Sequence, residues 1–594
     1  MKPFSEAYQK KRLHELLSNI LDSEKAAGWV IERRMDKADE LLRRYSDKTI
    51  ALLGFDVDHI KDFVFGTSKP LEIQGASEML KDLDLDRPIL REVLQAEGLS
   101  TTNVLFAGGG TGLLVLPGGK AAAVSGRIQS RFNLDGGIKS CTVVHQKLTP
   151  YELVCGPGAD TKHPVITFPG VGRIAAEKGH PIRFGQIMQL LGDRMREAKE
   201  EKMVFAYAPL PGVVRRCSSC GLEAAVVTDR IPSNDSESEK GAAAEGGDAP
   251  QAKDVRIYSQ EGDPVCSHCL QKREAGRGER NRLKKSPMKT AQTINDIAGE
   301  DERGHYAVVY ADANNMGSTF SELETMADYT LFSLAVTDVL KDAVKRLIEA
   351  HALKGHYQAP ILGGDDLFFI VPAHKAARLS SDLVKEVRNG FRRKAADLEE
   401  RDDLAQRLAG IGMSVGFVVV PAHFAIRYAA DYAEALLRSA KKKARKLKTD
   451  CIDYLVIKDA SPLNVSIEEL RTSQLYRKTP EGDFKLTCKP FTLKEFDGMI
   501  ADVENLDKAN VPQSQLQQIE SILKREPPKV ASLLIRSQLP RVEAWRSFCE
   551  LAELPSLEHL AFSHRMLFRP RMNVQRYRSA FLDLMELYGL REGR

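Results

Sequence analysis

Two adjacent carboxylates, Asp365 and Asp366, follow the glycines Gly363 and Gly364 in a stretch flanked by apolar residues, 361–371. The apolar flanks predict two buried strands joined at a tight turn, and the glycines let the backbone turn sharply and let a ligand approach it. Neighbouring carboxylates repel each other, so they favour a divalent cation, and oxygen ligands of this kind suit Mg²⁺ or Mn²⁺ with nucleotide phosphates. The alternative is an acidic hairpin turn without a ligand, because Gly and Asp favour turns anyway.

A third carboxylate, Asp312, follows the apolar run Val308 to Ala311. In a ferredoxin-like sheet the first strand runs beside the hairpin, so we expect Asp312 to lie next to Asp365 and Asp366. Three carboxylates can hold two divalent cations, which activate an attacking hydroxyl and stabilise a leaving pyrophosphate. These residues therefore predict a catalytic site for metal-dependent nucleotidyl transfer.

The residues that follow Asp312, together with a later basic run, predict where a triphosphate binds. Asn314 and Asn315 precede an expected helix, whose N-terminal amides can receive phosphates. Lys441 opens a run, 441–448, in which six of eight residues are basic. Lysines there can neutralise the β- and γ-phosphates of a nucleotide.

Four of the nine cysteines form two Cys-x-x-Cys pairs, Cys217 with Cys220 and Cys266 with Cys269. Such pairs predict a structural tetrahedral Zn²⁺ site, with a redox role for the thiols as the weaker alternative and with His268 able to replace one cysteine.

Two further segments accompany the cysteine pairs. Residues 233–252 between the pairs are rich in Ser, Glu, Gly and Ala, which predicts a disordered insert. Residues 272–289 after the second pair are basic, which favours a solvated surface or contact with nucleic acid.

The hydrophobic pattern predicts the same βαββαβ order twice, from Thr49 and again after residue 300, as in a ferredoxin-like fold. The first copy has Asp56 and Asp58 at the end of its first strand, but its hairpin tip holds three glycines and no carboxylate. We therefore expect this copy to be catalytically silent. Its Gly109 is a candidate wall of the site for an acceptor nucleotide, because a glycine neither repels nor blocks a phosphate.

The chain is therefore predicted to be an α+β protein with two ferredoxin-like domains around a zinc-binding unit. The expected parts are an N-terminal helical segment (1–47, a solvated lead-in), the first domain (48–205), the zinc-binding domain with its insert (206–300), the second domain (301–459) and a helical C-terminal domain (460–594). The net charge is only +4. No apolar run of about 18 residues and no signal-peptide pattern is found, so we expect a cytoplasmic protein that does not enter the membrane.

The second copy resembles the palm of GGDEF-type and other nucleotidyl cyclases, through Ala433-Glu434, Leu437, Ala440-Lys441 and Ala444-Arg445. Two such palms around a cysteine-rich unit, with a helical C-terminal domain, resemble the large polymerase-like subunit of type III CRISPR effector complexes. The segments 56–67, 73–80 and 511–516 are similar to that family's first palm and C-terminal domain. The likeness covers nearly the whole chain from Thr49 onwards.

This resemblance implies a subunit that holds guide RNA and target RNA together with partner proteins in antiviral defence. On binding target RNA it would convert ATP to cyclic oligoadenylate messengers, with Mg²⁺ or Mn²⁺ at the carboxylates and structural Zn²⁺ at the cysteines. Two departures stand out. The HD nuclease domain of many relatives is missing, so no DNA cleavage is expected. Many relatives carry Asp at the position of Asn314, which weakens the case for a second tightly bound metal.

Two other functions stay open at this stage. One is a stand-alone GGDEF-like or nucleotidyl cyclase that makes another cyclic nucleotide without RNA. The other is a non-catalytic scaffold of the complex whose palm only binds nucleotide. An adenylate joined to a different acceptor is a further possible product.

Overall fold

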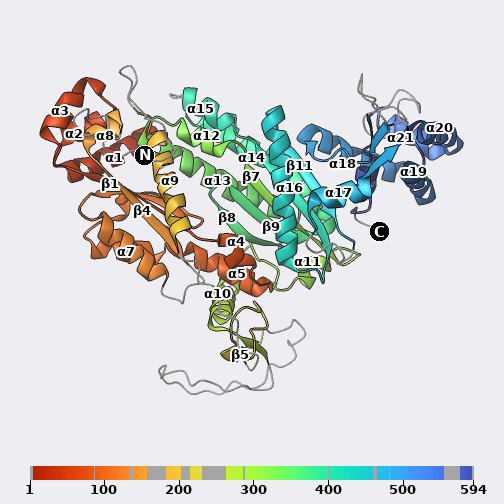
Figure 1. The fold of residues 1–594 in the computed structure, drawn as a ribbon, viewed down its shortest axis with the longest axis horizontal. Coiled ribbons are helices and arrows are strands. Elements are labelled where there is room, and N and C mark those ends of the chain that lie inside the picture. Colours follow the sequence, from red (N-terminus) through yellow and green to blue (C-terminus); the bar gives the residue numbers. More distant parts are fainter. Residues whose placement is uncertain are drawn as a thin grey trace.

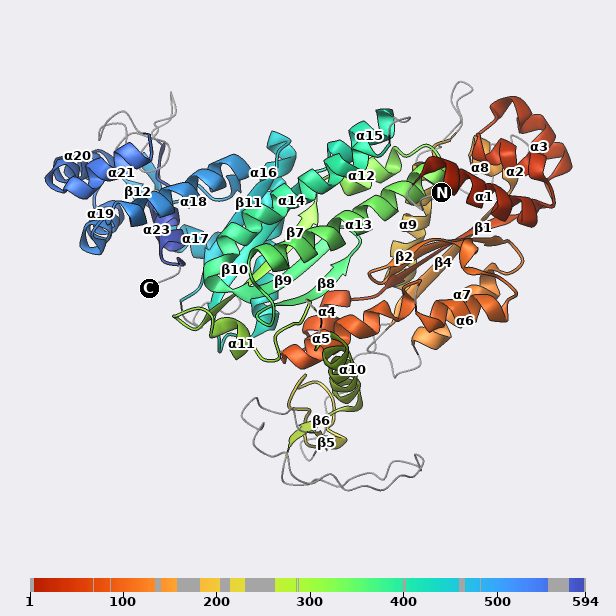
Figure 2. The same ribbon diagram turned by 180° about the vertical axis from the view of Figure 1, so that it is seen from behind.

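Two β-sheets with helices packed on them form the centre of the molecule (Figures 1 and 2). The computed structural model describes residues 5–67, 69–85, 87–133, 140–156, 182–202, 214–229, 262–284, 286, 288–398, 402–458, 465–480, 482–553 and 576–591. The predicted insert, 233–252, lies outside the described residues. None of the described helices is both long and apolar enough to cross a membrane.

The first sheet has four antiparallel strands in the order β2-β3-β1-β4, which is the strand order of a ferredoxin-like unit. The residues that follow β1 form α4 and α5, and α7 leads from β3 into β4. The bounds are β1 Ile50–Val57, α4 Ile60–Phe65, α5 Pro70–Leu80, α6 Pro88–Ala96, β2 Val104–Gly108, β3 Thr111–Pro117, α7 Ala121–Phe132, β4 Cys141–Leu148, α8 Pro150–Cys155 and α9 Phe184–Glu201.

The second sheet repeats this order in four of its six strands, β10-β7-β9-β8, and adds β11 and β14 beyond β10. The sequence predicted the four-stranded unit but not the two added strands. The bounds are β7 His305–Ala313, α12 Met316–Ser321, α13 Met326–Ala350, β8 Gln358–Gly363, β9 Asp366–Pro372, α14 Ala376–Ala396, α15 Asp402–Ala409, β10 Met413–Pro421, α16 Ile426–Leu447, β11 Cys451–Val456 and β14 Phe491–Thr492.

Alternating side chains of the second sheet enter two different hydrophobic cores, as the two-residue period of a strand requires. Val309 and Ala311 of β7 pack on the side of α13 and α14. Val308 and Tyr310 pack on the side of α16, where residues of the first half of the chain join the same core. The core on the side of α16 therefore contains residues of both halves of the chain.

The N-terminal segment forms α1 (Glu6–Leu21), α2 (Glu24–Ile31) and α3 (Ala38–Arg44). Ser5 and Ser23 cap the first two helices with their hydroxyls. Leu13, Leu16 and Leu17 of α1 are buried in a core that includes apolar residues of the first sheet. The expectation of a merely solvated lead-in was therefore wrong, because α1 has an apolar stripe that packs on the rest of the chain.

The described C-terminal part contains α17 to α21, α23 and also a small sheet, β12-β13-β15, which corrects the purely helical prediction. Two of its strands are only four residues long, and β13 pairs with the distant β15, so a local pattern could not reveal them. The bounds are α17 Ile467–Leu475, β12 Tyr476–Thr479, β13 Gly482–Lys485, α18 Leu493–Lys508, α19 Gln513–Arg525, α20 Pro528–Gln538, α21 Glu543–Leu551, β15 Arg576–Arg578 and α23 Phe581–Tyr588.

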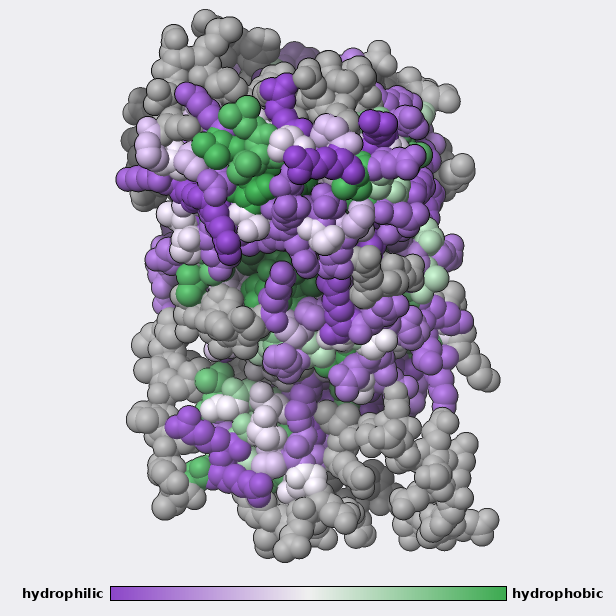
Figure 3. Space-filling model, turned by 90° about the vertical axis from the view of Figure 1, so that its right-hand side faces the viewer, coloured by the Kyte–Doolittle hydropathy of each residue, from purple (hydrophilic) through white to green (hydrophobic). Residues whose placement is uncertain are grey.

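The C-terminal end of the molecule exposes apolar side chains. Figure 3 faces this end and shows apolar atoms gathered among polar ones in its upper half. The exposed large apolar side chains of α20 are Val530, Leu533 and Leu534, and Leu533 is 65% exposed.

Candidate active site

Asp312 and Asp366 are directly opposite each other on the neighbouring antiparallel strands β7 and β9. Gly363 pairs with Asp366 across the hairpin, so the turn consists of Gly364 and Asp365. Gly364 has a φ of +60°, a conformation that favours glycine. The backbone amide of Ala313 donates to the carbonyl of Asp365 at 3.3 Å, which holds the turn against the end of β7. The fold thus brings the three predicted carboxylates to one end of the sheet.

Asp312 is paired with Lys441, the lysine predicted from the basic run, which comes from α16. The lysine also donates to the carbonyl of Ala313 at 3.3 Å. Burial, together with the charges of Asp365 and Asp366, raises the pKa of Asp312 to about 7. Its second oxygen, Oδ1, is buried and has no hydrogen-bond partner among the described residues. A buried carboxylate oxygen without a donor is a position that a cation would satisfy.

Asp366 is held by Tyr310, a residue that the sequence did not single out. The Tyr310 hydroxyl donates to Asp366 Oδ1 at 3.0 Å. Lys61 of α4, from the first half of the chain, lies with its Nζ 4.5 Å from the centre of the Tyr310 ring and 3.0 Å from a carboxylate oxygen of Glu434. Burial and the charge of Asp365 raise the pKa of Asp366. When a tyrosine lies within an apolar strand, the sequence does not show that its hydroxyl contacts a carboxylate.

The two predicted phosphate-binding asparagines lie at the end of β7. The side chain of Asn314 is engaged by Ser414, whose hydroxyl donates to it at 2.8 Å, and by Asp450 at 3.4 Å. Asn315 has a φ of +61° and precedes the six-residue helix α12. In this structure the Asn314 side chain is thus bonded to residues outside the carboxylate group.

The three carboxylates form an open arrangement. Among the described residues, the groups of three or more ligand atoms that all lie within 4.8 Å of one another are both in the cysteine unit. The repulsion between carboxylates and the pairing of Asp312 with Lys441 account for the wider spacing here. The donor set, all carboxylate oxygens with one unpartnered atom, fits Mg²⁺ or Mn²⁺.

The corresponding acids of the first sheet are neutralised by lysines of the same half. Asp56 pairs with Lys199 at 2.7 Å, and Lys202 pairs with Asp58. Burial raises the pKa of Asp56. Burial alone would raise the pKa of Asp58. The pKa is nevertheless lowered, because Lys202, Thr142 and Ser140 donate hydrogen bonds to the carboxylate.

The turns of the two sheets touch. Gly109 of the β2–β3 turn lies against Gly363, so close that a Cβ on Gly109 would be 2.4 Å from the Gly363 Cα. Gly109 and Gly110 both have positive φ, +65° and +85°. The predicted nucleotide-binding glycine Gly109 therefore packs on the second hairpin, while its neighbours Gly108 and Thr111 line a cavity.

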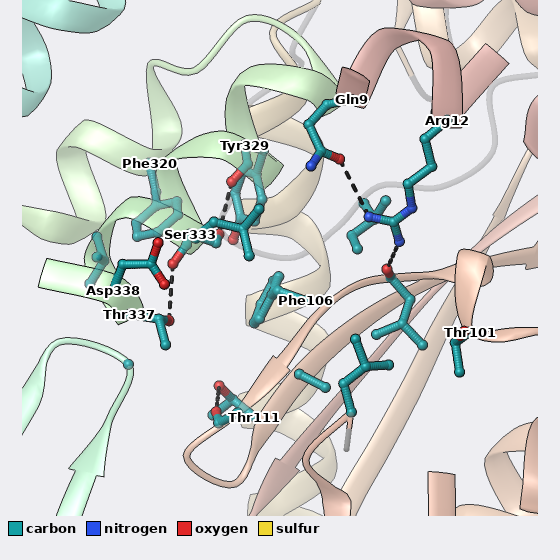
Figure 4. A pocket seen from close by; sticks show the side chains of 18 of the residues that line it. Gln9, Arg12, Thr101, Phe106, Thr111, Phe320, Tyr329, Ser333, Thr337 and Asp338 are labelled. Carbon is teal, nitrogen blue, oxygen red and sulfur yellow. Dashed lines mark hydrogen bonds between the residues drawn. The ribbon is translucent and has the colours of Figure 1, made fainter. Parts of the chain in front are cut away.

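This cavity of about 960 Å³ lies between the two halves and ends at Gly364 and Asp365 (Figure 4). Its walls come from α1, from β2 with its turn, and from α13. Phe106 projects into the space, and the hydroxyl residues Ser333 and Thr337 of α13 line it. Pockets for small molecules have volumes of about 300–1,000 Å³, so this cavity is large enough for a nucleotide.

The four predicted cysteine ligands come together. The sulfur atoms of Cys217, Cys220, Cys266 and Cys269 all lie within 4.8 Å of one another, and the Sγ atoms of Cys220 and Cys266 are 3.9 Å apart. Zn–S bonds of about 2.3 Å in a tetrahedron place sulfur atoms about 3.8 Å apart, so this cluster can bind a metal such as zinc. The remaining candidate, His268, contacts Glu223 at 2.8 Å instead.

Part of the basic segment after the cysteines is buried, which corrects the expectation of a solvated or RNA-contacting run for Lys272 and Arg273. Both lie in α10 (Ser267–Leu283), and Arg273 is fully buried. Arg273 donates to Glu72 at 2.7 Å, and it also donates to Asp229 and Asp263. A buried charge looks like an exposed one in a sequence, so only the packing of α10 on α5 reveals this network.

That packing is close because each helix has a glycine at the crossing. A Cβ on Gly75 of α5 would be 1.7 Å from the carbonyl oxygen of Lys272. A Cβ on Gly276 of α10 would be 2.2 Å from the carbonyl oxygen of Leu71. Side chains at these positions would push the helices apart, so α10 is fixed to α5 through backbone contact.

Comparison with known proteins gives one match by sequence. Residues 305–449 match the family model of the second palm domain of Cas10/Cmr2. No curated protein matches the chain.

Solved structures with a similar fold include a Csm1–Csm4 cassette in complex with cA3 (13% identity, 95% of this chain and 73% of that chain, TM-score 0.49). A second is a Csm1–Csm4 cassette in complex with cA4 (12% identity, 89% of this chain and 73% of that chain, TM-score 0.49). A third is Csm1 in T. onnurineus (14% identity, 94% of this chain and 72% of that chain, TM-score 0.47).

The matched segment contains β7, the Gly-Gly-Asp-Asp turn and Lys441, so the resemblance predicted from the sequence is confirmed: residues 305–449 are a second palm domain of the Cas10/Cmr2 family.

Proposed function

We propose that this chain is the large subunit of a type III CRISPR effector complex and that it converts ATP to cyclic oligoadenylates when the complex binds target RNA. The observation that carries the proposal is the gathering of Asp312, Asp365 and Asp366 beside Lys441, at the end of a cavity between the two halves. Carboxylates beside a lysine and a nucleotide-sized space are what nucleotidyl transfer requires.

The chain's own residues have separate tasks in this reaction. Asp312, Asp365 and Asp366 would hold Mg²⁺ or Mn²⁺, which supplies activation of the attacking hydroxyl and stabilisation of the leaving pyrophosphate. Lys441 places a positive charge beside them for the β- and γ-phosphates of the donor ATP. A ribose hydroxyl of the acceptor attacks the donor α-phosphate, a phosphodiester bond forms, and pyrophosphate leaves.

The first sheet serves as a second, catalytically silent palm in this proposal. Its strand order is that of the second palm, but lysines neutralise Asp56 and Asp58, and its turn carries no carboxylate. Gly108 and Thr111 contribute to the cavity wall, where an acceptor nucleotide would face Asp365.

The cysteine unit, which lies between the two palms in the sequence, would hold one structural Zn²⁺. The apolar side chains exposed on α20 support assembly with other protein subunits, because contiguous exposed apolar surface marks interaction sites. Guide RNA and target RNA complete the proposed set of partners.

The test is to incubate the purified complex with radiolabelled ATP, with and without target RNA, and to separate the products by chromatography. Asp365→Ala with Asp366→Ala should abolish the cyclic products while the complex still assembles. Glu200→Ala with Glu201→Ala is the matched control, because it removes two adjacent, exposed carboxylates from α9. Equal product from the catalytic double variant and the wild type would end the proposal.

The same assay separates the alternatives. A stand-alone cyclase would consume ATP or GTP without RNA or partner subunits. A scaffold would bind ATP but form no product under any condition, and the double variant would then behave like the wild type.

A further inference from the structure

The helix α1 forms the wall of the cavity that lies opposite the acidic turn. Tyr8, Lys11 and Arg12 line the cavity from this side, whereas Gly364 and Asp365 line its other end. Figure 4 shows the Arg12 side chain reaching from α1 toward β2. No function could be predicted for this segment from its sequence, because a charged helix near an N-terminus is usually an ordinary surface.

Arg12 is a half-buried cation whose bonds go to uncharged acceptors. Its guanidinium donates to the carbonyl of Thr102 at 3.1 Å, to the carbonyl of Val104, and to the side-chain oxygen of Gln9 at 3.4 Å. Within the described part of the chain, no carboxylate forms an ion pair with it. Burial lowers its pKa, but an arginine stays protonated at neutral pH.

The guanidinium has donors left over. It carries five N–H groups, and the three bonds just described use two on Nη2 and one on Nη1. The Nε–H and one Nη1–H therefore have no acceptor among the described residues. A half-buried guanidinium at a cavity wall, with donors that no described residue uses, is a site that an anion can bind.

The charged residues of α1 that line the cavity are Lys11, Arg12 and Glu15. Lys11 is 70% exposed, and its nearest carboxylate, Glu15, is 4.0 Å away. Lys341 of α13 also lines the cavity, one helical turn beyond Asp338. The opposing acid Asp338 is paired with Lys394 at 2.8 Å, so it does not cancel them.

We propose that Arg12 and Lys11 form an anion subsite for the 5′-triphosphate of the acceptor, which is either ATP or a growing oligoadenylate. The inference rests on the proposed function for the identity of the ligand. A linear oligoadenylate has a triphosphate at one end and a free ribose hydroxyl at the other. With the triphosphate on α1, the rest of the molecule extends along the cavity toward Asp365, past Phe106, on which a base can stack.

The test is the affinity of the full-length protein for α,β-methylene-ATP, which binds like ATP but cannot be attacked with loss of pyrophosphate, measured by calorimetry. Lys11→Glu replaces an attraction by a repulsion and should weaken binding about tenfold. Lys10→Glu is the matched control, since Lys10 is on the same helix, pairs with Glu6 at 2.5 Å and does not line the cavity. It should change affinity less than about twofold.

Arg12→Gln should weaken binding of this analogue by about tenfold or more, and Arg12→Lys by less. Adenosine separates phosphate binding from damage to α1: its affinity should be the same in all variants, because it has no phosphate. A triphosphorylated diadenylate, compared with the 5′-hydroxyl form, distinguishes a growing chain from ATP as the preferred occupant.

Wild-type affinity for the analogue in both Lys11→Glu and Arg12→Gln would overturn the inference, as would an equal loss of adenosine binding. Product formation is measured separately. Charge-dependent binding without any cyclic product would refute the proposed function and leave the subsite intact. Normal cyclic products with charge-independent binding would refute the subsite alone.

Discussion

Gly109 and Gly363 meet backbone to backbone, each at the tip of a hairpin from a different sheet. A Cβ on Gly109 would be 2.4 Å from the Gly363 Cα, and a Cβ on Gly363 would be 2.2 Å from the Gly109 Cα. Carbon atoms do not approach this closely without displacing backbone. The relative position of the two sheets at the candidate active site therefore depends on the absence of two side chains.

Gly109→Ala should lower product formation by about tenfold or more, because the added methyl pushes the acidic turn away from the first sheet and a φ of +65° is strained for alanine. Initial rates with labelled ATP check this. Gly119→Ala is the control, since a Cβ at Gly119 meets nothing within 4 Å. Undiminished turnover in a folded Gly109→Ala protein would show that the contact between the turns does not matter for catalysis.

Tyr310→Phe should raise the metal concentration needed for half-maximal activity by about tenfold, because the tyrosine hydroxyl orients the Asp366 carboxylate. A magnesium titration of the reaction rate measures this. Tyr306→Phe is the matched control on the same strand, since its hydroxyl donates to the carbonyl of Phe424 at 2.7 Å, away from the carboxylates. If both variants respond to magnesium alike, Tyr310 has no role in positioning.

Wild-type protein should contain one zinc per chain, and Cys266→Ser should contain less and unfold at a lower temperature. Cys266 is a proposed ligand and also caps α10 by accepting from the Cys269 amide at 3.4 Å. Elemental analysis and thermal unfolding check both effects. Cys488→Ser, outside the cluster, should keep its zinc; wild-type protein prepared without chelators and free of zinc would contradict the assignment.

Asp583 should make the protein more stable as the pH falls from 7 to 5. Complete burial raises its pKa to about 6 from an ordinary 3.8, although Lys489 lies 3.8 Å away. The folded state therefore binds a proton at a pH where the unfolded chain does not, so this contribution is present below about pH 4, shrinks as the pH rises and is lost above about pH 6.

The change between pH 7 and pH 5 should be about 1 kcal/mol in urea titrations followed by tryptophan fluorescence. Asp583→Asn should lack this component, although it is less stable overall because Thr487 and the Cys488 amide both donate to the carboxylate. An identical pH dependence in the variant would mean that Asp583 does not titrate in this range.

The residues that could be predicted from the sequence are those with a local pattern. The apolar run before Asp312 and the Gly-Gly-Asp-Asp turn each define a strand end, and the strand order of the fold then brings them together. The cysteine cluster could be predicted because the spacing of two Cys-x-x-Cys pairs indicates a metal site.

The rest depended on packing between distant segments. Tyr310 and Lys61 lie near Asp366, and Arg12 lines the opposite wall of the cavity, at positions whose neighbours in sequence carry no signal. Arg273 is charged but fully buried, and its partners are found only where α5 meets α10. The hydrophobic periodicity of the sequence does not show which of several lysines and arginines is buried.

The glycine crossing of α5 and α10 has a mechanical consequence. Cys266 and Cys269 stand at the start of α10, the crossing lies farther along the same helix, and α5 packs in turn on β8, which ends at Gly363. Helices in backbone contact have no flexible side chains between them to absorb slippage. A displacement of the cysteine unit would therefore be transmitted through α10 and α5 to β8, the strand that leads into the acidic turn.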